Sequence, residues 1–359
     1  MIRQRIRQGK TMITIKEIAK ELNMSPTTVS NVIHGKTKEV SQSTIERVRE
    51  FLEQVDYVPN INARNLAQNQ SKIIGMVIKT SEDRYTHILS DPFVSEMLGA
   101  IEQTVREAGY FLMIYISNDI TDIIKRVATW NVDGLLLFWM LNDDAIRVYQ
   151  SFRKPAVYID TYVDWDAIEE IGNMYVNVGL EDEKGVFEAV SYLIDQGHKK
   201  IGFLTDSFNG VDRERFLGYR RALATAGIDY KDRNFFEIHS EKSRIDESLE
   251  KLAKKAKDFT AIFCCSDNFA AMMINACEKA GIRVPQDISI MGFDDYLSGR
   301  LFRPGLTTMH QDISEKGAIA ARTLIDMVKG NEPETHQIIM KTKLVVRDSV
   351  AAPRLSDKQ

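Results

Sequence analysis

Hydrophobic and polar positions follow helical spacing in three short segments near the start of the 359-residue chain. The first segment follows Thr14-Ile15-Lys16-Glu17, which has the S/T-x-x-E form of a capping box. The second follows Ser25-Pro26, a capping residue with proline at the first helical position, and the third opens at Val40-Ser41. Their apolar faces can form one small core, made of residues 15, 18, 19, 22, 29, 32, 33, 45, 48, 51 and 52. The pattern predicts a compact three-helix module.

From residue 73 onward, short apolar runs alternate with amphipathic helices, which predicts an α/β fold whose parallel sheets are covered on both faces. A first set of strands is expected at 73–78, 111–116, 134–139 and 156–159, with helices near 92–108, 120–130 and 143–152. A second set is expected at 175–178, 201–204, 235–238, 261–264 and 288–293, with helices near 182–196, 213–226, 245–257 and 268–280. The two sets predict two lobes, and ligands of such sheets bind beyond the carboxyl ends of the strands.

Charge separates the small helical head from the large body. Residues 1–72 hold 12 Lys/Arg and 7 Asp/Glu, a net +5, whereas the remainder carries −9, which gives the whole chain −4. A basic head predicts contact with a polyanion such as nucleic acid, and the body then serves another purpose. With 44% hydrophobic and 27% charged residues, the composition excludes collagen-like, low-complexity and mostly disordered classes.

The sequence lacks the usual signals of several other classes of protein. The longest uncharged apolar run, 134–141, is far shorter than the ~18 residues of a membrane span, and no apolar leader follows the N-terminal arginines. Three cysteines, at 264, 265 and 277, fit neither a disulfide framework nor a zinc site. No glycine-rich nucleotide motif follows the first strand of either set. We therefore expect a cytoplasmic protein without metal or cofactor.

An α/β enzyme is the alternative from a different functional class. The adjacent carboxylates Asp294-Asp295 favour this alternative, because paired carboxylates are common in active sites. Neighbouring residues on a loop seldom face one site, however, and no pairing of base and nucleophile is evident. The sequence therefore favours a protein that is not an enzyme.

Two helices joined by a short turn, with small polar residues opening the second, are typical of a helix-turn-helix, although any small helical module can share this pattern. The segment that follows favours the helix-turn-helix. It reads Tyr57-Val58-Pro59-Asn60 and continues with Ala63 and Leu66. Together with Ser25 to Ser30 and Val40-Ser41, it resembles the lactose-repressor/galactose-repressor family of bacterial transcription factors. The resemblance covers residues of about 13–349.

The resemblance implies how the head meets DNA. Pro26, Thr27 and Asn31 would reach base edges in the major groove, where an asparagine can pair bidentately with adenine. Ser25, Thr28 and Ser30 would face phosphates or cap the helix. The segment 60–68 would form a hinge helix that enters the minor groove from each copy of a homodimer, with Leu66 as the wedge between base steps. The implied hinge contacts are Asn60, Ala63, Arg64 and Leu66.

The body carries further motifs of the family, at 132–134, 197–201, 215–219, 266–267, 292–295 and 307–311. They imply a periplasmic-binding-protein-like core of two lobes, with the chain crossing between them near 171–175, 310–313 and 331–336. The implied domains are a basic extension at 1–12, a helix-turn-helix at 13–59, a hinge and linker at 60–72, an effector-binding and dimerisation core at 73–349, and a tail at 350–359. The first lobe would span 73–171 and 313–331, and the second 175–310 and 336–349. The extension is either a basic arm or a stretch before a true start at Met12.

The same resemblance places an effector site between the lobes. Arg215 and Asp294 correspond to the main polar contacts, with Ser266 and Gln311 nearby, and the first lobe contributes Phe93, Trp139 and Asp160. Carboxylates, a guanidinium and aromatic faces suit a polyhydroxylated ligand, so a sugar is expected, with a purine as the alternative. A third possibility keeps the DNA-binding head but makes a phosphorylated partner protein the effector. The implied function is that of a homodimeric repressor of a palindromic operator, controlled allosterically by its effector.

Overall fold

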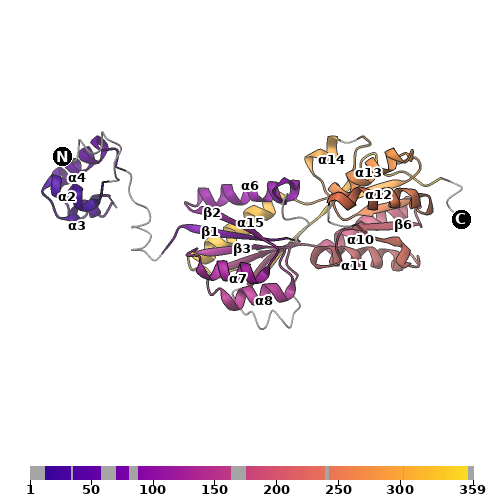
Figure 1. Ribbon diagram of the computed structural model, residues 1–359, viewed down its shortest axis with the longest axis horizontal. Helices are drawn as coiled ribbons and strands as arrows, with labels where there is room; N and C mark the ends of the chain where they lie inside the picture. The colour runs from indigo at the N-terminus through magenta and orange to yellow at the C-terminus, as the bar shows by residue number, and fades with distance from the viewer. Residues whose placement is uncertain are drawn as a thin grey trace. The chain divides into compact units, whose positions relative to one another are not determined.

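The computed structural model describes residues 13–33, 35–57, 70–80, 88–162, 175–238, 242–301 and 303–354. It divides into two compact units, Met1–Ser71 and Lys72–Gln359 (Figure 1). The predicted hinge residues Asn60, Ala63, Arg64 and Leu66 lie outside the described residues, as do residues 1–12.

The head folds into the three predicted helices, α2 (Ile15–Leu22), α3 (Pro26–Ile33) and α4 (Gln42–Gln54). The capping box at the start of α2 is confirmed, because the Glu17 amide donates to Thr14 Oγ1 over 3.3 Å and the Thr14 amide donates to Glu17 Oε2 over 2.9 Å. Asn23 ends α2 in a left-handed conformation, with φ 53°, and lets the chain turn directly into α3. The predicted apolar faces meet in one core whose centre includes the fully buried Ile18, Val29 and Val48.

The body contains two six-stranded sheets. The first has the order β11-β5-β4-β3-β1-β2, and all its neighbouring strands are parallel. Its strands are β1 (Ile73–Lys79), β2 (Phe111–Ser117), β3 (Gly134–Phe138), β4 (Ala156–Ile159), β5 (Tyr175–Leu180) and β11 (Gln337–Met340). Helices α6 (Pro92–Glu107) and α15 (Ile313–Val328) cover one face, and α7 (Ile120–Thr129) and α8 (Asn142–Ser151) cover the other (Figure 1).

The second sheet has the order β12-β10-β9-β8-β6-β7 and is parallel except that β12 runs antiparallel to β10. Its strands are β6 (Ile201–Thr205), β7 (Phe235–Glu237), β8 (Ala261–Cys264), β9 (Ser289–Asp294), β10 (Thr307–His310) and β12 (Lys343–Val345). Helices α10 (Asp182–Asp195) and α11 (Gly210–Thr225) cover one face, and α12 (Lys242–Lys255) and α13 (Asp267–Lys279) cover the other. The short helices are η3 (Asp232–Asn234), η4 (Ala256–Asp258) and α14 (Leu297–Leu301).

The expected division of the lobes is wrong at two places. Strand β5 pairs with β4, and β11 pairs with β5, so both belong to the first lobe and not to the second. The chain therefore leaves the first lobe at Glu181, not near 171–175, and leaves it again after Met340, not near 331–336. An apolar run shows that a strand is buried, but it does not show which sheet the strand joins.

The expected tail also begins too early. Ala351 exchanges two hydrogen bonds of 3.1 Å with the hydroxyl of Ser289 at the start of β9, so this part of the chain is bound to the second lobe.

The crossing segments lie against one another. The Glu181 amide donates to the Met340 carbonyl over 3.0 Å, and the Thr342 amide donates to Glu181 Oε1 over 3.3 Å. Gly185 allows this contact, because a Cβ at that position would lie 2.5 Å from Thr342 Oγ1. Two crossings are thus tied to the first turn of α10.

Candidate DNA-binding face and ligand cavity

Helix α3 and the residue before it carry the DNA-contacting side chains predicted for the head. Ser25, Pro26 and Thr27 are exposed, whereas Thr28, Ser30 and Asn31 are half-buried. The Ser25 hydroxyl accepts a 3.0 Å hydrogen bond from the Thr28 amide and lies 2.8 Å from Thr28 Oγ1, so Ser25 caps the helix. Small polar side chains on an exposed helix start can approach a groove of DNA closely.

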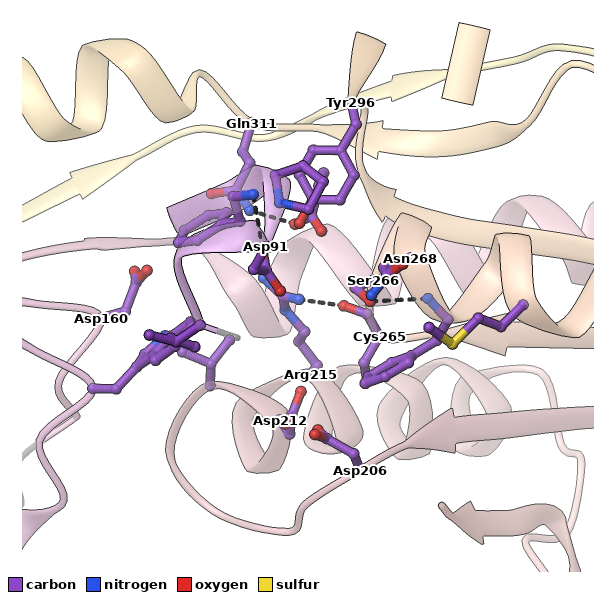
Figure 2. A pocket seen from close by; sticks show the side chains of 18 of the residues that line it. Asp91, Asp160, Asp206, Asp212, Arg215, Cys265, Ser266, Asn268, Tyr296 and Gln311 are labelled. Carbon is purple, nitrogen blue, oxygen red and sulfur yellow. Dashed lines mark hydrogen bonds between the residues drawn. The ribbon is translucent and has the colours of Figure 1, made fainter. Parts of the chain in front are cut away.

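A cavity of about 450 Å³ lies between the two lobes of the body. All seven residues predicted to bind an effector line it: Phe93, Trp139, Asp160, Arg215, Ser266, Asp294 and Gln311. Figure 2 shows Asp160, Arg215, Ser266 and Gln311 around the same space. A volume of this size is typical of small-molecule sites.

Strand ends position most of these side chains, as expected for parallel sheets. Trp139 follows β3, Asp160 follows β4 and Asp294 closes β9. All three have positive φ angles, of 58°, 52° and 123° respectively. Non-glycine residues seldom adopt such angles, and where they occur the surrounding fold must hold them.

Arg215 lies at the base of the cavity and is almost fully buried. Its Nε donates to Asp182 Oδ1 over 2.8 Å, and its Nη1 donates to the Cys265 carbonyl (Figure 2). The guanidinium also stacks on the Phe293 ring, 3.7 Å from its centroid. Burial opposes the charge, but the carboxylates of Asp182 and Asp294 outweigh it and raise the pKa of Arg215, which remains charged.

Asp294 faces the cavity beside Arg215. Gln311 Nε2 donates to Asp294 Oδ1 over 2.6 Å. Burial raises the pKa of Asp294 to about 7, although Arg215 and hydrogen bonds from Tyr296 and Gln311 favour the charged form. Its carboxyl therefore titrates near neutral pH.

The wall from the first lobe combines an ion pair with aromatic rings. Lys316 Nζ lies 2.8 and 2.9 Å from the two carboxylate oxygens of Asp160, and both side chains are buried. Burial raises the pKa of Asp160, while Lys316 opposes this shift. The rings of Phe93, Phe138 and Trp139 stack pairwise, with centroid distances of 5.8 Å for Phe93–Phe138, 4.1 Å for Phe138–Trp139 and 6.3 Å for Phe93–Trp139. The ion pair and the stacked rings together fix the position of this wall of the cavity.

Further lining residues were not predicted from the sequence. Asp91 caps α6, where its carboxylate accepts from the Phe93 amide over 2.9 Å, and Asp212 accepts from the Ser207 hydroxyl over 2.7 Å. The Asp91-Pro92 sequence is a helix-start signal that could have located Asp91. Ser266, which was predicted, also caps α13 by accepting from the Phe269 amide over 3.2 Å. The remaining lining residues are Ile88, Ser90, Pro92, Asp206, Val211, Ile245, Cys265, Asn268, Phe269, Met272 and Tyr296.

In the described part of the chain, no group of three or more His, Cys, Asp and Glu side chains is arranged to hold a metal ion. The helices within the described ranges are also too short or too polar to cross a membrane.

An exposed helix-turn-helix and a ligand-sized cavity in a two-lobe core together define a DNA-binding regulator with a separate effector-binding domain. Residues 14–60 match the family described as bacterial regulatory proteins, lacI family, and residues 190–350 match the periplasmic binding protein-like domain. The transcriptional repressor PurR of Mannheimia succiniciproducens is 33% identical over 345 residues, which are 94% of this chain and 99% of that protein. The chain belongs to the lacI family and is a transcriptional repressor of the helix-turn-helix type.

Solved structures share the fold. The lac repressor dimer bound to operator and the anti-inducer ONPF has a TM-score of 0.80 at 23% identity, over 95% of this chain and 100% of that one. The complex of the regulator CelR with cellobiose has a TM-score of 0.69 at 24% identity, over 94% and 99% of the two chains. The expected head and two-lobe core are thus confirmed.

Proposed function

We propose that this repressor acts in the cytoplasm as a homodimer that binds a palindromic operator and responds to a small sugar held in the cavity between its lobes. The observation that carries the proposal is the presence in one chain of a helix-turn-helix, whose second helix has an exposed start, and a ligand-sized cavity. In this proposal Pro26, Thr27 and Asn31 contact base edges, and Ser25, Thr28 and Ser30 support the helix or face phosphates. The hinge residues Asn60, Ala63, Arg64 and Leu66 enter the minor groove.

The chemistry of the cavity supports a sugar. The carboxylates of Asp160 and Asp294 can accept hydrogen bonds from hydroxyl groups, and Arg215 can donate to a ring or hydroxyl oxygen. The faces of Phe93 and Trp139 offer an apolar wall for the carbon side of a sugar ring. CelR, which has the same fold, was solved in complex with cellobiose.

A purine is the second candidate ligand. The rings of Phe93 and Trp139 line the cavity with planes only 15° apart, so a planar base could also pack against them. Relatives at 30–33% identity are repressors that bear the name PurR. Arg215 and Asp294 together offer a donor and an acceptor to the edge of a base.

Ligand binding would alter the relation between the lobes, because the cavity takes side chains from both. Arg215 of the second lobe pairs with Asp182, which follows the crossing at Glu181. Tyr162 of the first lobe donates to the same Asp182 carboxylate. A ligand that engages Arg215 thus acts on a group that both lobes share, and it would shift the population toward one arrangement of the lobes.

A gel-shift experiment tests the proposed function. Purified protein is mixed with the intergenic DNA upstream of its own gene at two salt concentrations, with and without a panel of sugars and purines. Specific and salt-sensitive retardation that one sugar releases or strengthens supports the proposal. If operator binding responds only to purines, the sugar is wrong and a purine is the effector. Specific DNA binding that no compound alters favours a phosphorylated partner protein as effector, and capture from a lysate would test that outcome.

A further inference from the structure

The walls of the ligand cavity are rich in negative charge. Among the described lining residues, one cation, Arg215, faces five aspartates: Asp91, Asp160, Asp206, Asp212 and Asp294. Lys316 balances Asp160 from behind the wall, and the ion pair of Arg215 is with Asp182, whose side chain has no exposed surface. In the described part of the chain, neither Asp212 nor Asp294 has an ion-pair partner within 4.0 Å. The base of the cavity therefore carries more negative than positive charge.

Hydrogen-bonding groups show the same imbalance. Two of the nitrogens of Arg215, Nε and Nη1, already donate to Asp182 and to the Cys265 carbonyl. Gln311 uses its Nε2 on Asp294, and its Oε1 is buried without a hydrogen-bond partner although the residue is only 2% exposed. A buried acceptor left unpaired costs free energy, so Gln311 adds to the unmet demand for donors at this wall. The cavity thus offers more acceptors than donors.

Aromatic rings complete the environment of this acidic wall. Phe93, Trp139, Phe269 and Tyr296 line the cavity. Phe93 already lies 5.3 Å from the ammonium group of Lys316, measured from the ring centroid. The face of an aromatic ring attracts a cation that has been removed from water.

Building on the proposed sugar ligand, we propose that the ligand carries a positively charged amine, as an amino sugar does, and that the ammonium lies beside the carboxylates of Asp212 and Asp294. A hydroxyl both donates and accepts, whereas an ammonium donates three hydrogen bonds and accepts none, which matches the surplus of acceptors. It also adds positive charge beside Asp212 and Asp294, which share the single charge of Arg215 with Asp182. A neutral sugar would fill the cavity without adding positive charge.

The titration of Asp294 agrees with this assignment. Burial raises the pKa of this carboxyl to about 7, so a substantial fraction is protonated at neutral pH when the cavity is empty. An ammonium placed beside it favours the carboxylate and displaces that proton. Binding of an amino sugar near pH 7 is therefore accompanied by proton release to the buffer.

Calorimetry with matched sugars tests the inference on the full chain. The pairs are D-glucosamine with D-glucose and D-galactosamine with D-galactose, and the N-acetylated amino sugars serve as neutral controls of similar size. We expect at least one amino sugar to bind about tenfold or more tightly than its neutral partner and its N-acetyl form. Raising the salt concentration should weaken the binding of the amino sugar and leave the binding of the neutral sugar unchanged.

The variant Asp212→Asn tests whether this carboxylate binds the amine, because the substitution removes one negative charge and nearly preserves the shape of the side chain. It should lose most of the preference for the amine. Lys279→Gln, an exposed change on α13, is the matched control and should keep the preference.

Each remaining outcome counts against the inference. If a neutral sugar binds as tightly as its amino partner and alters operator binding, the charged amine is wrong and the proposed function stands. If purines bind and no sugar does, or if no member of any pair binds, both the amine and the sugar are rejected. An amine preference that Asp212→Asn leaves intact rejects the assigned position.

Discussion

The buried ion pair between Lys316 and Asp160 allows a quantitative test of the cavity wall. Lys316 has no exposed surface, and its ammonium lies 2.8 and 2.9 Å from the two oxygens of Asp160. Lys316→Met keeps much of the side-chain volume but leaves the carboxyl without its cation. Removing one partner of a buried pair typically costs about 3–5 kcal/mol, because the remaining charge is uncompensated. We expect a loss of this size in the free energy of unfolding.

The variant should also acquire a dependence on pH. Burial already raises the pKa of Asp160, and without Lys316 the pKa rises further. A carboxyl whose pKa is higher in the folded state than in the unfolded state favours folding at low pH, and this contribution is lost as pH rises through the folded-state pKa. The destabilisation of Lys316→Met should therefore grow as the pH rises above the ordinary pKa of an aspartic acid, about 4.

Urea unfolding of the wild type and the variant, measured at several pH values, provides the assay. Lys329→Met is the matched control, because Lys329 lies at the end of the same helix in an exposed 3.7 Å pair with Asp326. An exposed pair contributes about 0–1 kcal/mol. If Lys316→Met costs no more than Lys329→Met, or if its cost does not change with pH, the account of this wall is refuted.

Three further predictions concern the core, the cavity and the DNA-binding helix. Gly218→Ala should destabilise the protein by about 1–3 kcal/mol, because the added Cβ would approach the Glu183 carbonyl. Gly99→Ala is the control, since a Cβ at that position meets open space, and thermal unfolding of both variants measures the difference. Ligand affinity should fall up to about tenfold per pH unit below 7, where Asp294 is protonated, and titrations of Asp294→Asn should show no such dependence. Asn31→Ala should weaken specific operator binding by about 1–3 kcal/mol and leave non-specific binding unchanged, which gel shifts with operator and unrelated DNA would reveal.

The sequence predicts most elements because their periodicities are strong. The capping residues Thr14 and Ser25 locate helix starts in the head, and short apolar runs locate the central strands. Strand β5 was assigned to the wrong lobe, since its six buried residues would suit the interior of either sheet. The strands β10, β11 and β12, of four, four and three residues, were not predicted, because such short runs carry little periodicity. The helix α15 was not predicted either.

The cavity could be predicted only in part. Strand-end residues such as Trp139 and Asp294 lie where the fold class places ligand sites, and family motifs indicated Arg215. The partners of these residues were not predictable. Lys316 meets Asp160 across 156 positions of the sequence, and no periodicity links them. Contacts of this kind depend on how helices pack on the sheets, and a local pattern does not record that packing.

The central claim is that the cavity governs DNA binding, and Arg215→Ala tests it most directly. Operator affinity is measured by gel shift for the wild type, for Arg215→Ala and for Arg213→Ala, an exposed change on the same helix, with and without the ligand found in the panel. The account predicts that all three proteins bind the operator and that Arg215→Ala alone fails to respond to the ligand. A normal response from Arg215→Ala would contradict the account.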